Sequence, residues 1–240
     1  MHTMNTTQRP DCSWHYFPVW FFSLIRKICT LAFILVTQAA FAQTAACVDE
    51  SVEAVKPRLM TDVVQAPKSP GLIAFERKRY DFAYKELSSL PIKDMQSQYY
   101  LGVMTEQGLG TSKSPQGAMR WYLRAAESGS PQAQFALGKL FSGSADFPKN
   151  YAEAATWFQR SAEQGFGEAQ LRLGLMYRDG MGKPQDMACA LAWVDIATNA
   201  QVDGASAAQK NILKRTTPEE RASSLQLKAR LQSKLDQKTK

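Results

Sequence analysis

The most constraining feature of this chain is an internal repeat of 36 residues. A Leu-Gly pair and a tryptophan both return at that interval, and alanine and glutamine return at other matched positions. So many identities at one offset are typical of an array in which one structural unit is copied and stacked. The repeated residues that we expect to form its core are Leu101, Gly102, Trp121, Leu137, Gly138, Trp157, Leu173, Gly174 and Trp193.

Each unit is predicted to contain two helices joined by a loop. Ser114, Asn150 and Asp186 stand one repeat apart, and each precedes an amphipathic stretch whose first backbone N–H groups it can cap. Glycine in a helix costs about 1 kcal/mol against alanine, so the recurring Leu-Gly glycine indicates close approach of the paired helix. First helices are expected at 94–107, 131–142 and 167–179, and second helices at 115–128, 151–163 and 187–199.

The tryptophans lie in the second helices, between small residues. Ala118, Trp121 and Ala125 have i, i+3, i+7 spacing, and the other two units keep this pattern. Small residues around one large ring let a helix fit between its neighbours, so we interpret each tryptophan as a core residue. A ligand-stacking role is the alternative.

Three runs carry a resemblance to a known family. Residues 133–138, 154–165 and 169–180 resemble the Sel-one-like repeat, a tetratricopeptide-related helix pair, and the similarity covers three units over 94–201. The resemblance implies an all-α fold, a right-handed α-solenoid of antiparallel helix pairs. The second unit departs from the pattern because residues 141–146 lack the loop with two glycines, and we expect a different loop there.

The segments that flank the repeats are expected to cover the two ends of the array. Residues 43–71 are interpreted as an irregular lead-in, 72–93 as a degenerate capping helix pair, and 202–240 as C-terminal capping helices with a basic tail. A solenoid end exposes apolar surface unless such a cap covers it. Thr217 followed by Pro and two Glu residues predicts a helix start, and the apolar side of that helix is expected at Ala222, Leu225 and Ala229.

The first 42 residues have the order of a secretory signal peptide. Arg26 and Lys27 precede a short apolar run that ends in an A-x-A motif, which predicts cleavage near Ala42 and export to the periplasm of a Gram-negative cell. An N-terminal anchor in the inner membrane is the alternative. Cleavage would leave Cys47 and Cys189, either as a disulfide or as separate thiols.

Several kinds of chemistry are disfavoured by composition. Both histidines, His2 and His15, lie in the predicted signal peptide, so the mature chain would have no imidazole for catalysis or for metal binding. The Gly-Leu-Gly of 108–110 lacks the third glycine of a dinucleotide loop. We therefore expect no catalytic residues, no metal and no cofactor. Penicillin binding attributed to some Sel-one-like proteins leaves one alternative, a weak envelope hydrolase that cleaves a β-lactam or peptide bond.

Binding is the function that remains. Stacked helix pairs form a concave groove lined by the first helices, and positions there that differ between units are free to contact a partner. The predicted groove contacts are Tyr100, Lys139, Arg172 and Arg178. The resemblance implies an adaptor or scaffold for a protein or peptide in envelope processes.

The C-terminal stretch 205–240 is strongly basic. It holds nine Lys or Arg residues against three Asp or Glu, a net charge of +6. Contact with an anionic surface is one interpretation, and an ordinary solvated helix is the other. Export disfavours nucleic acid as a partner.

Overall fold

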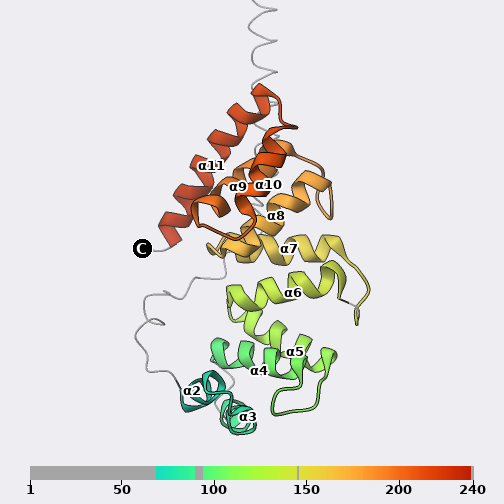
Figure 1. The fold of residues 1–240 in the computed structure, drawn as a ribbon, viewed down its shortest axis with the longest axis vertical. Helices are drawn as coiled ribbons and strands as arrows, with labels where there is room; N and C mark the ends of the chain where they lie inside the picture. Colours follow the sequence, from blue (N-terminus) through green and yellow to red (C-terminus); the bar gives the residue numbers. More distant parts are fainter. Residues whose placement is uncertain (1–68, 90–93, 145, 239–240) are drawn as a thin grey trace, which may run out of the picture. The chain divides into compact units, whose positions relative to one another are not determined.

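The computed structural model describes residues 69–89, 94–144 and 146–238, and these contain helices and no strand (Figure 1). All of them lie in one compact unit, Ser51–Lys240. The predicted signal peptide at 1–42 and the lead-in up to residue 68 are outside the described residues. The helices are α2 (Pro70–Glu76), α3 (Tyr80–Ser89), α4 (Met95–Gln107), α5 (Pro115–Glu127), α6 (Pro131–Gly143), α7 (Tyr151–Ala162), α8 (Gly167–Asp179), α9 (Met187–Asn199), α10 (Ala205–Leu213) and α11 (Pro218–Lys238).

The helices pack in chain order as antiparallel pairs. The repeats are α4 with α5, α6 with α7 and α8 with α9, and each second helix also packs against the first helix of the next unit. Figure 1 shows these helices as successive layers. The α2–α3 pair packs against α4, and α10 and α11 pack against α9. The predicted α-solenoid is therefore confirmed, with helix bounds within one residue of those expected. One boundary differs, because α2 begins at Pro70 inside the expected lead-in.

The predicted helix caps are in place. The side chains of Ser114, Asn150 and Asp186 each accept a hydrogen bond from the backbone N–H three residues later, at 3.1, 3.2 and 2.9 Å. Thr217 and Glu220 form a reciprocal capping box at the start of α11. Each bond satisfies a donor that the first helical turn leaves free.

The recurring glycines mark the closest contact inside each pair. A Cβ added to Gly138 would lie 2.6 Å from ring atoms of Phe158, and one added to Gly174 would lie 2.6 Å from Cγ2 of Val194. Gly102 meets the Tyr122 ring in the same way. The close approach predicted from sequence is confirmed, and the residue that fills the space is the one directly after each tryptophan.

The interpretation of all three tryptophans as core residues is right only for Trp193, which is fully buried. Trp121 and Trp157 are half-buried, and each packs against the apolar cluster of the preceding helices. The guanidinium groups of Arg124 and Arg160 lie over their rings, 5.1 and 4.7 Å from the centroids. Trp193 is more deeply buried because three helices, α8, α10 and α11, pack against α9. In contrast, α5 and α7 are each covered only by the helix before and the helix after them.

The apolar side of α11 was predicted wrongly. Leu225 is 63% exposed, and Ala222 and Ala229 are also exposed. The buried side is formed by Leu227 and Leu231, with Ser224 and Leu235 on the same strip. Three leucines spaced four residues apart bury more apolar area against α9 than one leucine and two alanines, which sets the rotation of the helix.

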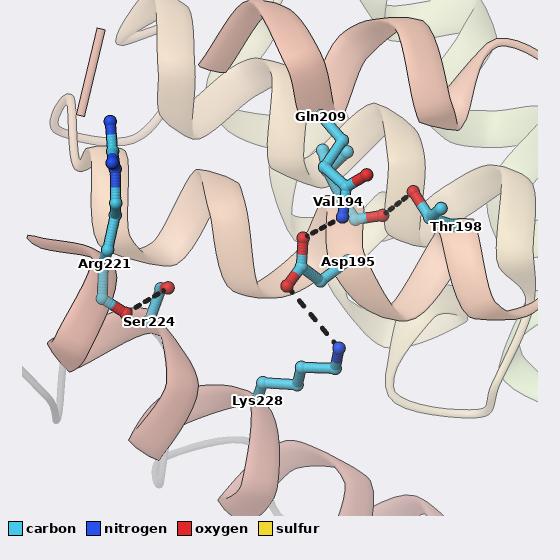
Figure 2. A network of polar contacts seen from close by, with 7 residues as sticks. All are labelled: Val194, Asp195, Thr198, Gln209, Arg221, Ser224 and Lys228. Carbon is cyan, nitrogen blue, oxygen red and sulfur yellow. Dashed lines mark hydrogen bonds and ion pairs between the residues drawn. The ribbon is translucent and has the colours of Figure 1, made fainter. Parts of the chain in front are cut away.

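A polar network also holds the last two helices on α9. Figure 2 shows the carboxylate of Asp195 on α9 between side chains of α10 and α11. It accepts a hydrogen bond from Gln209 Nε2 at 2.7 Å and pairs with Lys228 Nζ at 3.5 Å. Arg221 of α11 donates to the last carbonyl of α10, Leu213 O, at 2.7 Å. These contacts engage two basic residues of the stretch 205–240, Arg221 and Lys228, and contact of that stretch with an anionic surface stays one of its two interpretations.

Candidate functional site

The candidate site is a cleft on the face formed by the first helices. Its volume is about 750 Å³, and α6, α8, the turn between α9 and α10, and α10 itself all contribute to its lining. The lining side chains include Arg172, one of the predicted groove contacts, and Leu175, which lies one turn further along α8. The others are Phe135, Glu168, Leu171, Ala200, Gln201, Val202, Asp203 and Ala208, together with the glycines 165, 167 and 204.

The cleft forms because a fourth repeat begins and is then cut short. Val202 N donates to Ala197 O, just as Phe166 N donates to Ser161 O one repeat earlier. Ala205 is fully buried and stands one repeat after Ala169. However, α10 has 9 residues where α8 has 13, and it begins only after the turn through Gly204. A short first helix beside a full one leaves the surface of α8 open.

One wall of the cleft is held rigidly by aromatic packing. The Phe135 ring lies 5.5 Å from the Phe158 ring and 5.2 Å from the Phe166 ring, centroid to centroid. Val202 packs on α8, since its Cγ2 lies 2.5 Å from where a Cβ on Gly167 would be. While Val202 keeps this position, no residue larger than glycine fits at position 167 without a shift of its neighbours.

Three charged side chains line the cleft and are free to interact with a partner. Glu168 and Arg172 lie one turn apart on α8, and Asp203 is in the turn before α10. All three are exposed, and none forms an ion pair with another described residue. The cleft thus carries one positive and two negative charges, and none of the three is held in an ion pair on the described part of the chain.

The charge of Glu168 acts beyond its own helix. Burial raises the pKa of Tyr99 on α4, and the neighbouring Tyr100 and the carboxylates of Glu106 and Glu168 raise it further. Tyr99 therefore keeps its proton at neutral pH and can donate a hydrogen bond.

The four predicted groove contacts have different environments. Arg172 lines the cleft, and Lys139 is exposed on α6. Tyr100 is half-buried against Phe75, 4.9 Å between ring centroids, and so packs against the N-terminal cap. Arg178 makes a bidentate ion pair with the neighbouring Asp179, with bonds of 2.7 and 2.6 Å. The structure therefore brings one of the four into the cleft, and partner binding by any of them stays a prediction.

Sequence reasoning did not single out most of the lining. The sequence does mark Leu171 as a possible lining residue, because Tyr99 and Phe135 occupy the matched positions in the other two units and all three side chains are large and apolar. No sequence pattern marks Asp203 and Val202, since their place in the cleft depends on where α10 begins.

Other chemistry on the described residues is limited. No group of three or more His, Cys, Asp and Glu residues that could hold a metal ion occurs in the part of the chain that the structure describes. No helix within residues 69–89, 94–144 and 146–238 is long and apolar enough to cross a membrane. Cys189 in α9 is fully buried and disulfide-bonded, and every other cysteine of the chain precedes residue 69.

Comparison with known proteins identifies the repeat. The family model for the Sel1 repeat matches residues 96–130, 131–166 and 167–200. These three matches coincide with the three helix pairs, so residues 96–200 form three Sel1 repeats. Sel1 repeats generally mediate protein–protein interaction without catalysis.

Two solved structures are similar to the chain. A Sel1 repeat protein from Oxalobacter formigenes is 32% identical with a TM-score of 0.52, over 54% of this chain and 52% of that one. A protective antigen of uropathogenic Escherichia coli with an SLR fold is 22% identical with a TM-score of 0.46, over 75% of this chain and 45% of that one. The chain thus spans about half the length of either protein. No curated protein matches it.

Proposed function

We propose that this protein is an exported, non-catalytic adaptor that binds a segment of another protein on its first-helix face. The observation that carries the proposal is the cleft beside α8, which is lined from three helices and from the turns before α8 and before α10. Its volume of about 750 Å³ falls within the range of about 300 to 1,000 Å³ that is usual for ligand sites. A docked segment would therefore be anchored there by one or two side chains.

The chemistry of the lining supports binding. Leu171 and Leu175 offer apolar area, and the exposed charges around them are free to select a partner. Arg178, in contrast, is already engaged by Asp179. An apolar patch ringed by unpaired charges is the usual composition of a docking surface for a peptide segment.

Charge reversal tests the proposal. Mature protein immobilised on a support should retain a saturable partner from envelope extract, and Glu168→Lys combined with Asp203→Lys, which reverses the two acidic side chains of the cleft, should abolish retention. Glu153→Lys is the matched control, because Glu153 is exposed on α7, a second helix, and does not line the cleft. Thermal unfolding of all three proteins shows whether the fold is kept. Retention that survives reversal at 168 and 203, or is lost equally with the control, would contradict binding on the first-helix face.

Export is supported by the sequence of the first 42 residues alone, which are outside the described residues. If the signal is cleaved, the protein recovered from the periplasm should begin at Gln43. Intact-mass measurement of the periplasmic fraction checks this. A full-length protein in the inner-membrane fraction would favour the anchored alternative.

A further inference from the structure

The cleft carries an excess of negative charge. Glu168 and Arg172 are one helical turn apart on α8, so each partly compensates the field of the other. Asp203, on the turn across the cleft, has no such neighbour among the charges that line it. A partner side chain that enters therefore meets a net potential that favours a cation.

The floor between these charges is apolar. Leu171, Leu175 and Val202 are half-buried, so each presents part of its side chain to the cleft. The Phe135 ring forms one wall and is fixed by its two aromatic neighbours. An aliphatic side chain that lies on this floor would be removed from water. The residues before and after it in an extended segment would reach the rim of the cleft, where the carboxylates are.

We infer that the cleft binds an extended protein segment in which an aliphatic residue is flanked by Lys or Arg. This inference rests on the proposed function and adds the chemistry of the partner. The aliphatic side chain occupies the floor, and the basic residues pair with Asp203 and Glu168. Arg172 opposes a basic segment and so limits its affinity.

Synthetic peptides test the inference with the mature chain. Three fluorescein-labelled peptides share one Gly-Ser background and differ only at the centre, which is Lys-Leu-Lys, Glu-Leu-Glu or Lys-Ser-Lys. Fluorescence anisotropy measures each dissociation constant at low and at high salt. Because an exposed ion pair contributes up to about 1 kcal/mol, each pair corresponds to about fivefold in affinity. Lys-Leu-Lys should bind most tightly, and high salt should weaken it.

Conservative variants assign the charges. Asp203→Asn and Glu168→Gln should each weaken the Lys-Leu-Lys peptide by up to about fivefold, whereas Arg172→Gln should strengthen it by a similar factor. Glu153→Gln on α7 is the matched control, since its exposed carboxylate is outside the cleft. The opposite signs expected at 172 and 203 cannot arise from a general loss of fold.

The outcomes separate two failures. If no peptide binds, both the cleft as a docking site and this inference are wrong. If peptides bind but Glu-Leu-Glu binds as well as or better than Lys-Leu-Lys, only the partner chemistry is wrong. If Lys-Ser-Lys binds as tightly as Lys-Leu-Lys, the apolar floor is not used and the inference fails. Concentration-dependent self-association that Asp203→Asn abolishes would identify a second copy of this chain as the occupant and would overturn the inference.

Discussion

Replacing Gly138 with alanine probes the contact that holds each helix pair together. The new Cβ would lie 2.6 Å from Cδ1 and Cε1 of Phe158 and 2.9 Å from its Cγ, closer than carbon atoms pack. The Phe158 ring is 2% exposed and is packed against Phe135, so it has little room to move.

Two effects of opposite sign decide the size of the change. Overpacking of this kind costs about 1 to 3 kcal/mol, whereas alanine is favoured over glycine in a helix by about 1 kcal/mol. We therefore expect Gly138→Ala to lower the free energy of unfolding by about 1 kcal/mol, with an upper limit of about 2. Urea unfolding followed by circular dichroism at 222 nm measures it.

A double-mutant cycle isolates the contact. Phe158→Leu removes the ring atoms that Gly138 faces, so alanine at 138 should then be neutral or stabilising. A coupling free energy of about 1 kcal/mol or more between the two positions is the expected result. If Gly138→Ala stabilises the protein with Phe158 present, the ring does not occupy the space above the glycine and the packing argument is refuted.

Two further predictions concern other buried rings. Tyr122→Phe should lower stability by about 1 to 2 kcal/mol, because the hydroxyl donates to the half-buried carboxylate of Glu106 at 2.6 Å. Burial, followed by the bond to Glu106, raises the pKa of Tyr122, so its contribution is complete below the ordinary tyrosine pKa of 10.0 and is lost as the pH rises above it. The difference in urea midpoint between wild type and variant should therefore be smaller at pH 10.5 than at pH 8. A difference that is the same at both pH values would contradict this. Trp193→Ala should lower the free energy of unfolding by about 3 to 5 kcal/mol. Trp157→Ala should lower it by about 2 kcal/mol, because the Trp157 ring is half-buried. Equal losses in the same unfolding assay would show that α10 and α11 do not cover Trp193.

The periodicity of the sequence predicted the fold because its signals are local. Caps such as Ser114 and the small and large residues of each helix specify helix starts and packing faces within one unit. Contacts between adjacent units repeat, so one unit predicts the next. The same reasoning failed where a helix meets a surface that has no copy elsewhere. The rotation of α11 is set by α9, which is why Leu225 is exposed and Leu231 is buried.

The candidate site could be predicted only in part for the same reason. Variation at matched positions pointed to the first-helix face and to Arg172. The cleft itself depends on the late start and early end of α10, a property of the turn through Gly204 rather than of the repeat. Asp203 and Val202 gain their positions from that turn, so no periodic signal marks them.

Site-specific photocrosslinking tests the central claim, that a partner docks on the first-helix face, most directly. A photoreactive phenylalanine derivative would replace Leu175 in the cleft, or Thr156, which is exposed on the second helix α7. The account predicts that irradiation of cells gives a covalent adduct with another protein from position 175 and none from position 156. Equal adducts from both positions, or an adduct from 156 alone, would contradict it.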